Sequence, residues 1–367
     1  MTSVEQEAWI QIAYTKSVGP VRWRTLLDST QQDSVASYHA SFEHCASLWG
    51  EKVARTFVSE RTRDMQNAPE RLRTCESAGI SFVTLNDAHY PPLLREIHDA
   101  PPVLFYRGAL PAPERLLVSV VGTRLCTSYG DTVTRRLVRA LVGTQIGVVS
   151  GLAFGIDAAA HEEALRAQGY TLAVLPGGLD DASLVPPRHR PLAQRILVAG
   201  GALVSECPPG TPTLKHSYPI RNRLIAGLSK ATVIVEAALA SGTMHTAQSA
   251  LTENRELFAV PGPITSPVSA GPNCLLRDGA IPILSEEDLL HALGKTASSF
   301  SPTPTTLSLS LTPDQLRIYG ALSAHPTLAD DLARQHALSP AALSGILTHL
   351  ELSAHARMVG HNYWVRA

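Results

Sequence analysis

The sequence has few cysteines, few aromatic residues and almost no net charge. Its five cysteines among 367 residues are scattered and never spaced as Cys-x-x-Cys. This argues against a disulfide framework or a zinc ribbon and favours a reducing compartment. With 31 Lys and Arg against 32 Asp and Glu, the net charge is −1. No global basicity attracts nucleic acid, so any site for a polyanion must be a local patch of cations.

Long apolar runs and a leader segment are also missing. No apolar stretch approaches the roughly 20 residues that a helix needs to cross a bilayer. Residues 1–16 lack the apolar centre of a signal peptide. The hydrophobic content of 44% is ordinary for a globular protein, and 367 residues are enough for two or three domains. We therefore expect a cytoplasmic protein that does not contact membranes.

Composition divides the chain into four segments: a central one, one before it, and a linker and a last segment after it. Residues 1–75 have the pattern of short helices, and the turn Lys16–Pro20 resembles half of a helix-hairpin-helix or SAM-like module. A plain helix–helix turn is the simpler interpretation, and we prefer it. Residues 293–310 are rich in Ser, Thr and Pro, which predicts a flexible linker. Residues 311–367 hold three helical patterns and a β-like end, which suggests a winged helix, although its third helix carries no Arg or Lys.

In the central segment, residues 80–292, apolar runs alternate with amphipathic helical stretches. The runs are β-branched or aliphatic and are bounded by Gly, Pro or Ser, as buried parallel strands are. This alternation predicts an α/β domain with a doubly wound, parallel, Rossmann-like sheet. We expect strands at 116–121, 147–150, 171–175, 202–205, 232–235 and 257–260. We expect helices at 132–142, 157–167, 191–198, 221–228 and 245–254.

The segment Ser217–Gly227 places two arginines and an asparagine at the expected start of an apolar helix. A helix start offers unpaired N–H groups and a partial positive charge, both of which attract anions. The guanidinium groups of Arg221 and Arg223, with Lys215 just upstream, would strengthen that attraction. The segment therefore predicts a site for phosphate.

Three glycine-rich turns follow expected strands and precede expected helices. They are Gly122-Thr123-Arg124, Ser150-Gly151 with Gly155 beyond it, and Ser241-Gly242-Thr243. Glycine lets the main chain approach a ligand, and the following helix supplies N–H donors. In a parallel sheet these turns open on one edge, together with the Arg221 helix. Their convergence, more than any single turn, indicates a phosphate-binding site.

Signatures of nucleotide enzymes are missing from these turns, since neither GxGxxG nor GxxxxGK[ST] occurs. Asp157 and His161 share a helix face, as an acid–base pair would, but a helix cap and a core histidine explain them more simply. Glu206 and Glu236 follow two strands, where acids more often orient neighbouring arginines. We identify no catalytic residue, no metal-ligand set and no cofactor cradle, so the sequence predicts a binding protein rather than an enzyme.

Taken together, the motifs closely resemble the DNA-processing protein A family, also called DprA or Smf. The resemblance spans residues 80–293 and is looser for the two end segments, which are similar to a SAM-like module and a winged helix. The motifs that carry it, in chain order, are Gly122-Thr123-Arg124, Ser150-Gly151-x-Ala153-x-Gly155-Ile156-Asp157, Ser205-Glu206-x-Pro208, Pro219-x-Arg221-Asn222-Arg223, Ser241-Gly242-Thr243 and Ala259-Val260-Pro261-Gly262.

This resemblance implies a single-stranded DNA-binding mediator of natural transformation and competence. Such a protein protects incoming DNA, loads the RecA recombinase onto it for DNA recombination, and forms a homodimer through the Rossmann-like domain. Arg124 and Lys215 would grip phosphates, and Tyr218 would pack against a base or sugar. The remaining DNA-binding residues that the resemblance implies are Gly122, Thr123, Ser150, Gly151, Arg221, Asn222, Arg223, Ser241, Gly242 and Thr243.

One loop departs from the family pattern. Val185 and His189 stand where the family has Tyr and Asn, so this wall of the pocket is expected to contact nucleotide differently, with Arg188 and Arg190 as added charge. A rival interpretation is a phosphoribohydrolase of the lysine-decarboxylase-like class. Its Pro-Gly-Gly-x-Gly-Thr-x-x-Glu signature is incomplete after Pro176-Gly177-Gly178. A third is an interaction scaffold whose winged helix serves as a docking arm.

Overall fold

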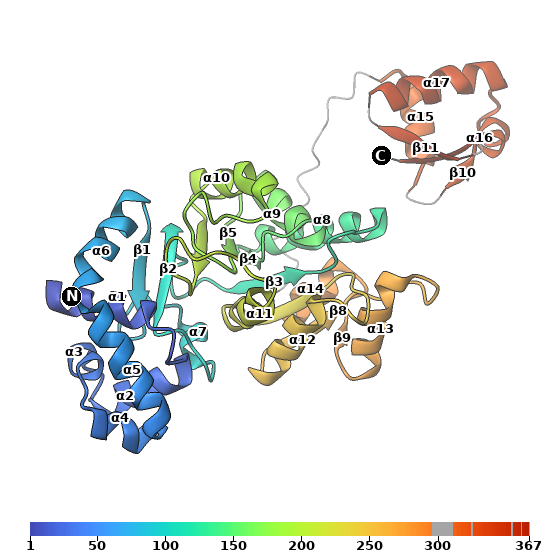
Figure 1. Cartoon of the computed structure of the whole chain (residues 1–367). Coiled ribbons are helices and arrows are strands. Elements are labelled where there is room, and N and C mark those ends of the chain that lie inside the picture. Colours follow the sequence, from blue (N-terminus) through green and yellow to red (C-terminus); the bar gives the residue numbers. More distant parts are fainter. Residues whose placement is uncertain (296–310, 324–325, 354, 361, 367) are drawn as a thin grey trace. The chain divides into compact units, whose positions relative to one another are not determined.

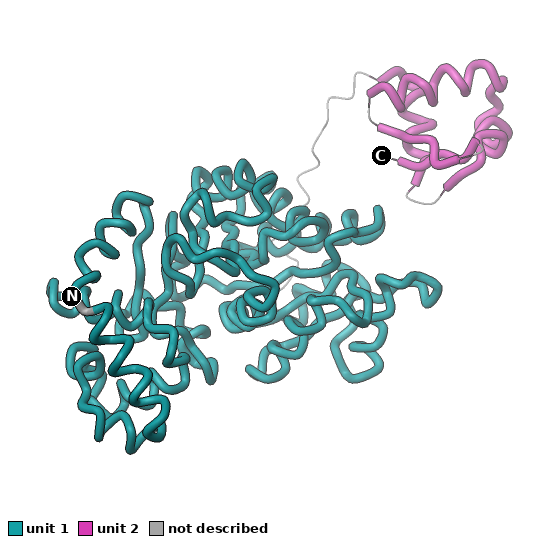
Figure 2. Tube along the Cα trace, viewed as in Figure 1, with its two compact units in different colours: residues 1–300 teal, residues 301–367 magenta. Residues whose placement is uncertain are grey.

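A computed structural model describes residues 1–295, 311–323, 326–353, 355–360 and 362–366. The chain divides into two compact units, residues 1–300 and 301–367, which are described separately (Figure 2). From residue 296 onward, the predicted linker lies outside the described residues. Of the helices in the described ranges, none is long and apolar enough to cross a membrane.

The first part of the larger unit is helical. Its helices are α1 (Ser3–Tyr14), α2 (Pro20–Ser29), α3 (Ser34–Tyr38), α4 (Phe42–Trp49), α5 (Glu51–Asp64) and α6 (Ala68–Ser77). Thr2 begins α1 with a capping box, and Pro20 occupies the first turn of α2, where its missing N–H costs nothing. The core contains Trp23 and Phe57, whose rings meet edge to face at 5.4 Å.

The turn between α1 and α2 is occupied by the protein's own carboxylate. The main-chain N–H groups of Lys16 and Ser17 donate to the two carboxylate oxygens of Glu60, at 2.8 and 3.0 Å. Glu60 comes from α5, so the contact ties the turn to a distant helix of the same module. Two main-chain donors of this turn are therefore already used by the protein itself.

A nine-stranded sheet forms the centre of the larger unit, in the order β1-β2-β6-β5-β4-β3-β7-β8-β9 (Figure 1). The strands from β6 to β9 in this order are parallel, whereas β1 and β2 add an antiparallel edge. This confirms the predicted doubly wound parallel sheet. The strands are β1 (Ser81–Thr84), β2 (Val103–Gly108), β3 (Leu117–Val121), β4 (Gly147–Ser150), β5 (Thr171–Val174), β6 (Ala202–Ser205), β7 (Ala231–Ile234), β8 (Glu256–Ala259) and β9 (Ile281–Pro282).

Helices cover both faces of this sheet. They are α7 (Pro92–Glu96), α8 (Ser128–Gly143), α9 (Ile156–Arg166), α10 (Arg190–Val198), α11 (Ser217–Gly227), α12 (Thr243–Thr252), α13 (Ala270–Arg277) and α14 (Glu286–Ala292). Val118 and Val120 of β3 join an apolar cluster with α8, α9 and α14. Leu117 and Val121 join another with α11, α12 and α13. Because side chains alternate along a strand, burial on both faces explains the continuous apolar runs.

The chain reverses its direction of travel across the sheet at β3. From β3 it proceeds through β4 and β5 to β6, and it then returns to form β7 on the other side of β3. The loops that follow β3 and β7 consequently diverge. In open α/β sheets this switch point leaves a crevice outside the carboxyl ends of the strands, where ligands bind.

The smaller unit is a winged helix, as predicted. It contains α15 (Pro313–Ala321), α16 (Ala329–His336) and α17 (Pro340–Leu352), with β10 (Thr327–Leu328), β11 (Ala356–Gly360) and β12 (Tyr363–Arg366). The three strands form an antiparallel sheet in the order β10-β12-β11. Ile318, Leu347 and Trp364 lie in its core. Its third helix, α17, carries no Arg or Lys.

Candidate functional site

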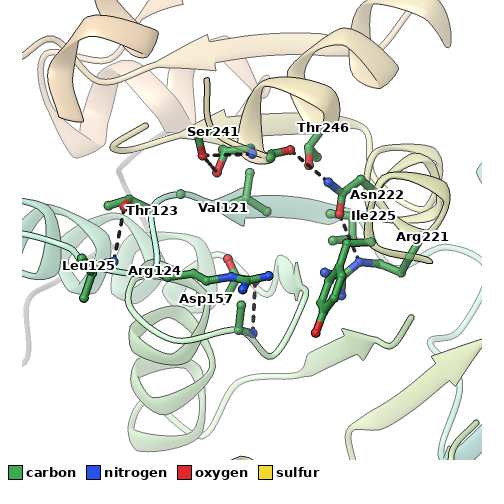
Figure 3. A pocket seen from close by; sticks show the side chains of 15 residues that line it. Val121, Thr123, Arg124, Leu125, Asp157, Arg221, Asn222, Ile225, Ser241 and Thr246 are labelled. Carbon is green, nitrogen blue, oxygen red and sulfur yellow. Dashed lines mark hydrogen bonds between the residues drawn. The ribbon is translucent and has the colours of Figure 1, made fainter. Parts of the chain in front are cut away.

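A cavity of about 310 Å³ opens at the switch point between β3 and β7. Its walls come from the loops after β3, β4 and β7 and from helices α11 and α12. Figure 3 shows Thr123 and Arg124 on one side and Asn222 and Ile225 of α11 on the other. The lining residues are Val121, Gly122, Thr123, Arg124, Leu125, Ala153, Asp157, Tyr218, Arg221, Asn222, Ile225, Ser241, Gly242, Thr243 and Thr246.

The loop after β3 is held at both ends by Glu236, which follows β7. The main-chain oxygen of Glu236 accepts from the N–H of Thr123 at 2.6 Å. Its buried carboxylate accepts from the N–H and the hydroxyl of Thr127, at 2.9 and 2.5 Å. Glu236 was expected to orient an arginine, but it instead fixes the loop that carries Arg124.

Arg124 projects from this loop as an exposed cation. Its guanidinium lies 4.9 Å from the centre of the Tyr218 ring, within the range of a cation–π contact. No carboxylate among the described residues forms an ion pair with Arg124. The cation and the aromatic ring therefore stand together at the cavity with both available to a ligand.

The loop after β4 packs directly on the loop after β3. Gly155 has a φ of +72°, and a side chain there would collide with the main chain of Thr123 and Arg124. The buried carboxylate of Asp157 accepts from the N–H groups of Gly151 and Ala153, at 3.1 and 3.3 Å. Burial raises the pKa of Asp157, and these hydrogen bonds and Arg221 oppose that rise.

His161 does not form an acid–base pair with Asp157. Its side chain is fully buried, and its Nδ1 lies 2.7 Å from the hydroxyl of Thr171 on β5. Burial lowers the pKa of His161 to about 3, so the imidazole is neutral at physiological pH. His161 is therefore a core histidine, as the simpler of the two interpretations predicted.

Arg221 lines the cavity, but its Nη1 and Nε donors are used by the protein. Its guanidinium donates to the main-chain oxygens of Gly151, at 2.9 Å, and of Val174. Its Nε donates to Asn222, whose amide in turn donates to the oxygen of Gly242 at 3.1 Å. Burial lowers the pKa of Arg221 to about 10, which leaves it charged at neutral pH. The pair Arg221–Asn222 thus joins the ends of β4 and β5 to the loop after β7.

Arg223 does not lie where it was expected. It is not among the cavity-lining residues, and its side chain is only 12% exposed. Its guanidinium binds the carboxylates of Asp99, at 3.0 Å, and Glu206. Burial raises the pKa of Glu206, and Arg223 opposes that rise. Arg223 therefore anchors α11 to the segments after α7 and β6 and lies outside the cavity lining.

The other expected residues divide between the cavity and its surroundings. Lys215 is exposed and lies outside the lining, without an ion pair among the described residues. The buried hydroxyl of Ser150 donates to the oxygen of Val120 at 2.7 Å, so it joins β4 to β3. The expected residues that line the cavity are Gly122, Thr123, Arg124, Tyr218, Arg221, Asn222, Ser241, Gly242 and Thr243. Those that do not are Ser150, Gly151, Lys215 and Arg223.

Sequence reasoning missed the apolar part of the lining, which includes Val121, Leu125 and Ile225. The sequence signal for Leu125 was its place directly after Arg124 in a polar turn, and the structure leaves this residue 86% exposed.

The altered loop of residues 178–190 is tied to the site by His189. The Nδ1 of His189 lies 2.8 Å from the main-chain oxygen of Leu152, and its ring packs edge-on against Phe154 with centres 4.6 Å apart. Asp180 accepts from the N–H of Gly210 at 2.6 Å, which fixes the other end of the loop. Within the described ranges, no three His, Cys, Asp or Glu side chains are grouped as a metal site would need.

Comparisons with known proteins point to one family. A model for DNA recombination-mediator protein A matches residues 81–294, and one for the DprA winged helix domain matches residues 301–359. The chain is 45% identical to protein Smf of Escherichia coli over 242 residues, which cover 66% of this chain and 63% of that protein. It thus spans less than two thirds of that relative's length. It is 36% identical to protein Smf of Synechocystis over 311 residues, covering 80% of this chain and 74% of that protein.

Solved structures of DNA processing protein A also resemble this chain. DNA processing protein A from Streptococcus pneumoniae superposes with a TM-score of 0.68 at 28% identity, covering 79% of this chain and 98% of that one. DNA processing protein A from Helicobacter pylori, whose structure is described in terms of its single-stranded DNA binding mode, superposes with a TM-score of 0.51 at 30% identity. That match covers 58% of this chain and 95% of the other.

Proposed function

Because the chain belongs to the DNA recombination-mediator protein A (DprA/Smf) family, we propose that it binds single-stranded DNA for DNA processing in natural transformation. The observation that carries this proposal is the exposed guanidinium of Arg124, stacked on Tyr218 at the mouth of the switch-point cavity. An unpaired guanidinium suits a phosphate, and an aromatic ring suits a base or sugar.

The cavity explains how a flexible polyanion can be held without an enzyme's chemistry. Arg124 binds a phosphate, and Ser241, Gly242 and Thr243 at the start of α12 line the same space. Lys215 adds a second cation beside the cavity. Arg221 and Asn222 keep the loops in place. Because phosphate contacts position a strand and do not read it, sequence preference is weak.

Three finer proposals rest on family membership. The bound strand is protected from nucleases, it is passed to the RecA recombinase, and two copies of the chain associate through the parallel-sheet domain. We place these events in the cytoplasm and assign the protein a mediator's role rather than an enzyme's. A fully buried His161 and a carboxylate of Asp157 engaged by main-chain N–H groups favour that assignment over a phosphoribohydrolase.

Salt dependence of binding tests the proposal. Fluorescence anisotropy of a labelled oligonucleotide gives the dissociation constant at several salt concentrations, for single-stranded and duplex DNA. The log–log slope should be about −0.7 for each neutralised phosphate of a single strand. Arg124→Ala and Lys215→Ala should each weaken binding to all sequences and flatten this slope by about 0.7.

Arg277→Ala is the matched control, because Arg277 is an exposed arginine paired with Asp278 on α13, away from the cavity lining. It should leave both affinity and slope unchanged. An unchanged slope in the Arg124 and Lys215 variants would remove these residues from the site. Tighter binding of duplex than of single-stranded DNA would overturn the proposed function.

A further inference from the structure

Phe154 is an exposed aromatic residue at the edge of the cavity. It lies in the loop after β4, and 40% of its surface is exposed. The preceding residue, Ala153, lines the cavity, and the following residue, Gly155, packs on the main chain of Thr123 and Arg124. The segment that carries Phe154 therefore lies next to the proposed phosphate grip.

The ring of Phe154 is held in place by His189. The two ring centres are 4.6 Å apart with an interplanar angle of 64°, and Nδ1 of His189 lies 2.8 Å from the main-chain oxygen of Leu152. The imidazole is thus fixed to the same loop that carries Phe154. A supported aromatic ring loses little conformational entropy when a ligand stacks on it.

Cations flank this aromatic pair. Arg188 and Arg190 are exposed on either side of His189, and neither forms an ion pair with a described carboxylate. The nearby acids are already engaged, since Asp181 binds Arg107 at 2.7 Å and Asp180 binds the N–H of Gly210. An apolar protein partner would leave both arginines without a counter-charge in the interface, which is costly. A nucleotide offers a flat base to the ring and a phosphate to the arginines.

Resting on the proposed binding of single-stranded DNA, we propose that Phe154 and His189 form a base-stacking step that extends the DNA path beyond the Arg124 cavity. The step lies on the β4–β5 side of the switch point. One base stacks on Phe154, and Arg188 or Arg190 meets an adjoining phosphate. Every base has a π face, so the step adds affinity without reading sequence.

Two oligonucleotides of equal length and charge test this step in the full chain. One is oligothymidine and the other carries abasic sites throughout. Phe154→Ala should weaken oligothymidine binding about five- to 150-fold, the range for one stacked base. It should leave the affinity for the abasic strand and both salt slopes unchanged, because no phosphate contact is lost. Leu251→Ala, an exposed apolar residue of α12 outside the cavity lining, is the matched control and should change nothing.

A second variant gives a direct signal. Phe154→Trp should bind oligothymidine like the parent chain, and its added fluorescence should be quenched by oligothymidine but not by the abasic strand. Unchanged oligothymidine affinity in Phe154→Ala, or an equal loss on both strands, would overturn the stacking step. Failure of the proposed function looks different, because the parent chain itself would then bind neither strand.

Discussion

Two neighbouring segments bring arginines to the carboxyl edge of the sheet, and they use them in opposite ways. In the loop after β3, Arg124 leaves its guanidinium exposed on the ring of Tyr218. In α11, Arg221 and Arg223 are largely buried and donate to the protein's own carbonyl and carboxylate oxygens. An arginine in a motif therefore predicts a ligand contact only when its donors are left free.

The position of the helix start explains the difference. The sequence pattern predicted a helix start at Arg221, which would have placed that residue among unpaired N–H groups. The structure begins α11 four residues earlier, at Ser217. Arg221 is then the fifth residue of the helix, beyond the four that carry unpaired N–H groups. Its side chain faces the sheet, where it joins loops rather than attracting an anion.

Replacing Arg221 should have the largest effect on the protein. Arg221→Ala leaves the main-chain oxygens of Gly151 and Val174 without a donor and Asp157 without its buried counter-charge. We expect a loss of about 3–5 kcal/mol in the free energy of unfolding, measured by urea denaturation. Arg124→Ala is the matched control and should stay within about 0.5 kcal/mol of the parent chain. Equal losses of unfolding free energy in the two variants would contradict the structural role that we assign to Arg221 and not to Arg124.

Replacing Arg223 should have the next largest effect, and that effect should depend on pH. Arg223→Ala removes the partner of Glu206 and Asp99, and we expect a loss of about 1–3 kcal/mol near neutral pH. Burial raises the pKa of Glu206 and Arg223 opposes that rise, so the pKa should climb further in the variant. A carboxyl group whose pKa is higher in the folded than in the unfolded state stabilises the fold at acid pH. This stabilisation is lost as the pH rises through the folded-state pKa.

The deficit of Arg223→Ala should therefore be smallest near pH 4.5 and grow toward neutral pH. Urea denaturation across that range measures it. Adding Glu206→Gln to the variant should flatten the pH dependence, because the amide does not ionise. A deficit that shrinks as pH rises would contradict the assignment of Arg223 as the partner of Glu206.

The sheet was more predictable than the site. The bounds of β4 and β6 agree with the predicted strands, because fully buried runs between glycines or serines have few alternatives. The strands β1 and β2 at one end of the sheet and β9 at the other were not predicted. Two of these are antiparallel additions, and the third has only two residues. Local pattern carries little information about such pairings.

For the site, the turns and their common edge were predictable from the strand–glycine–helix spacing. The spacing did not predict which of the cations would be left without an ion pair among the described residues. Arg223 pairs with Asp99 and Glu206, of which Asp99 is distant in sequence, and the loop of Arg124 is fixed by Glu236, which follows a different strand. These partners are set by tertiary contacts, and no spacing rule within a motif encodes them.

The smallest effect concerns main-chain donors, and it extends the comparison to the helical N-terminal segment. The N–H groups of Lys16 and Ser17 are used by Glu60, as the donors of Arg221 are used by carbonyls. Glu60→Ala frees both donors to partly exposed surroundings, so we expect a loss of about 1 kcal/mol in the free energy of unfolding. Glu60→Gln, which keeps one acceptor oxygen, should lose less.

DNA binding by these variants decides what the occupied turn means. If the turn only ties α1 and α2 to α5, single-stranded affinity and its salt slope should match the parent chain. If the turn were a phosphate site masked by its own carboxylate, Glu60→Ala would bind DNA more tightly and with a steeper salt slope. We expect no such gain, because the exposed cation beside Tyr218 supplies the grip and the turn between α1 and α2 lies outside that cavity.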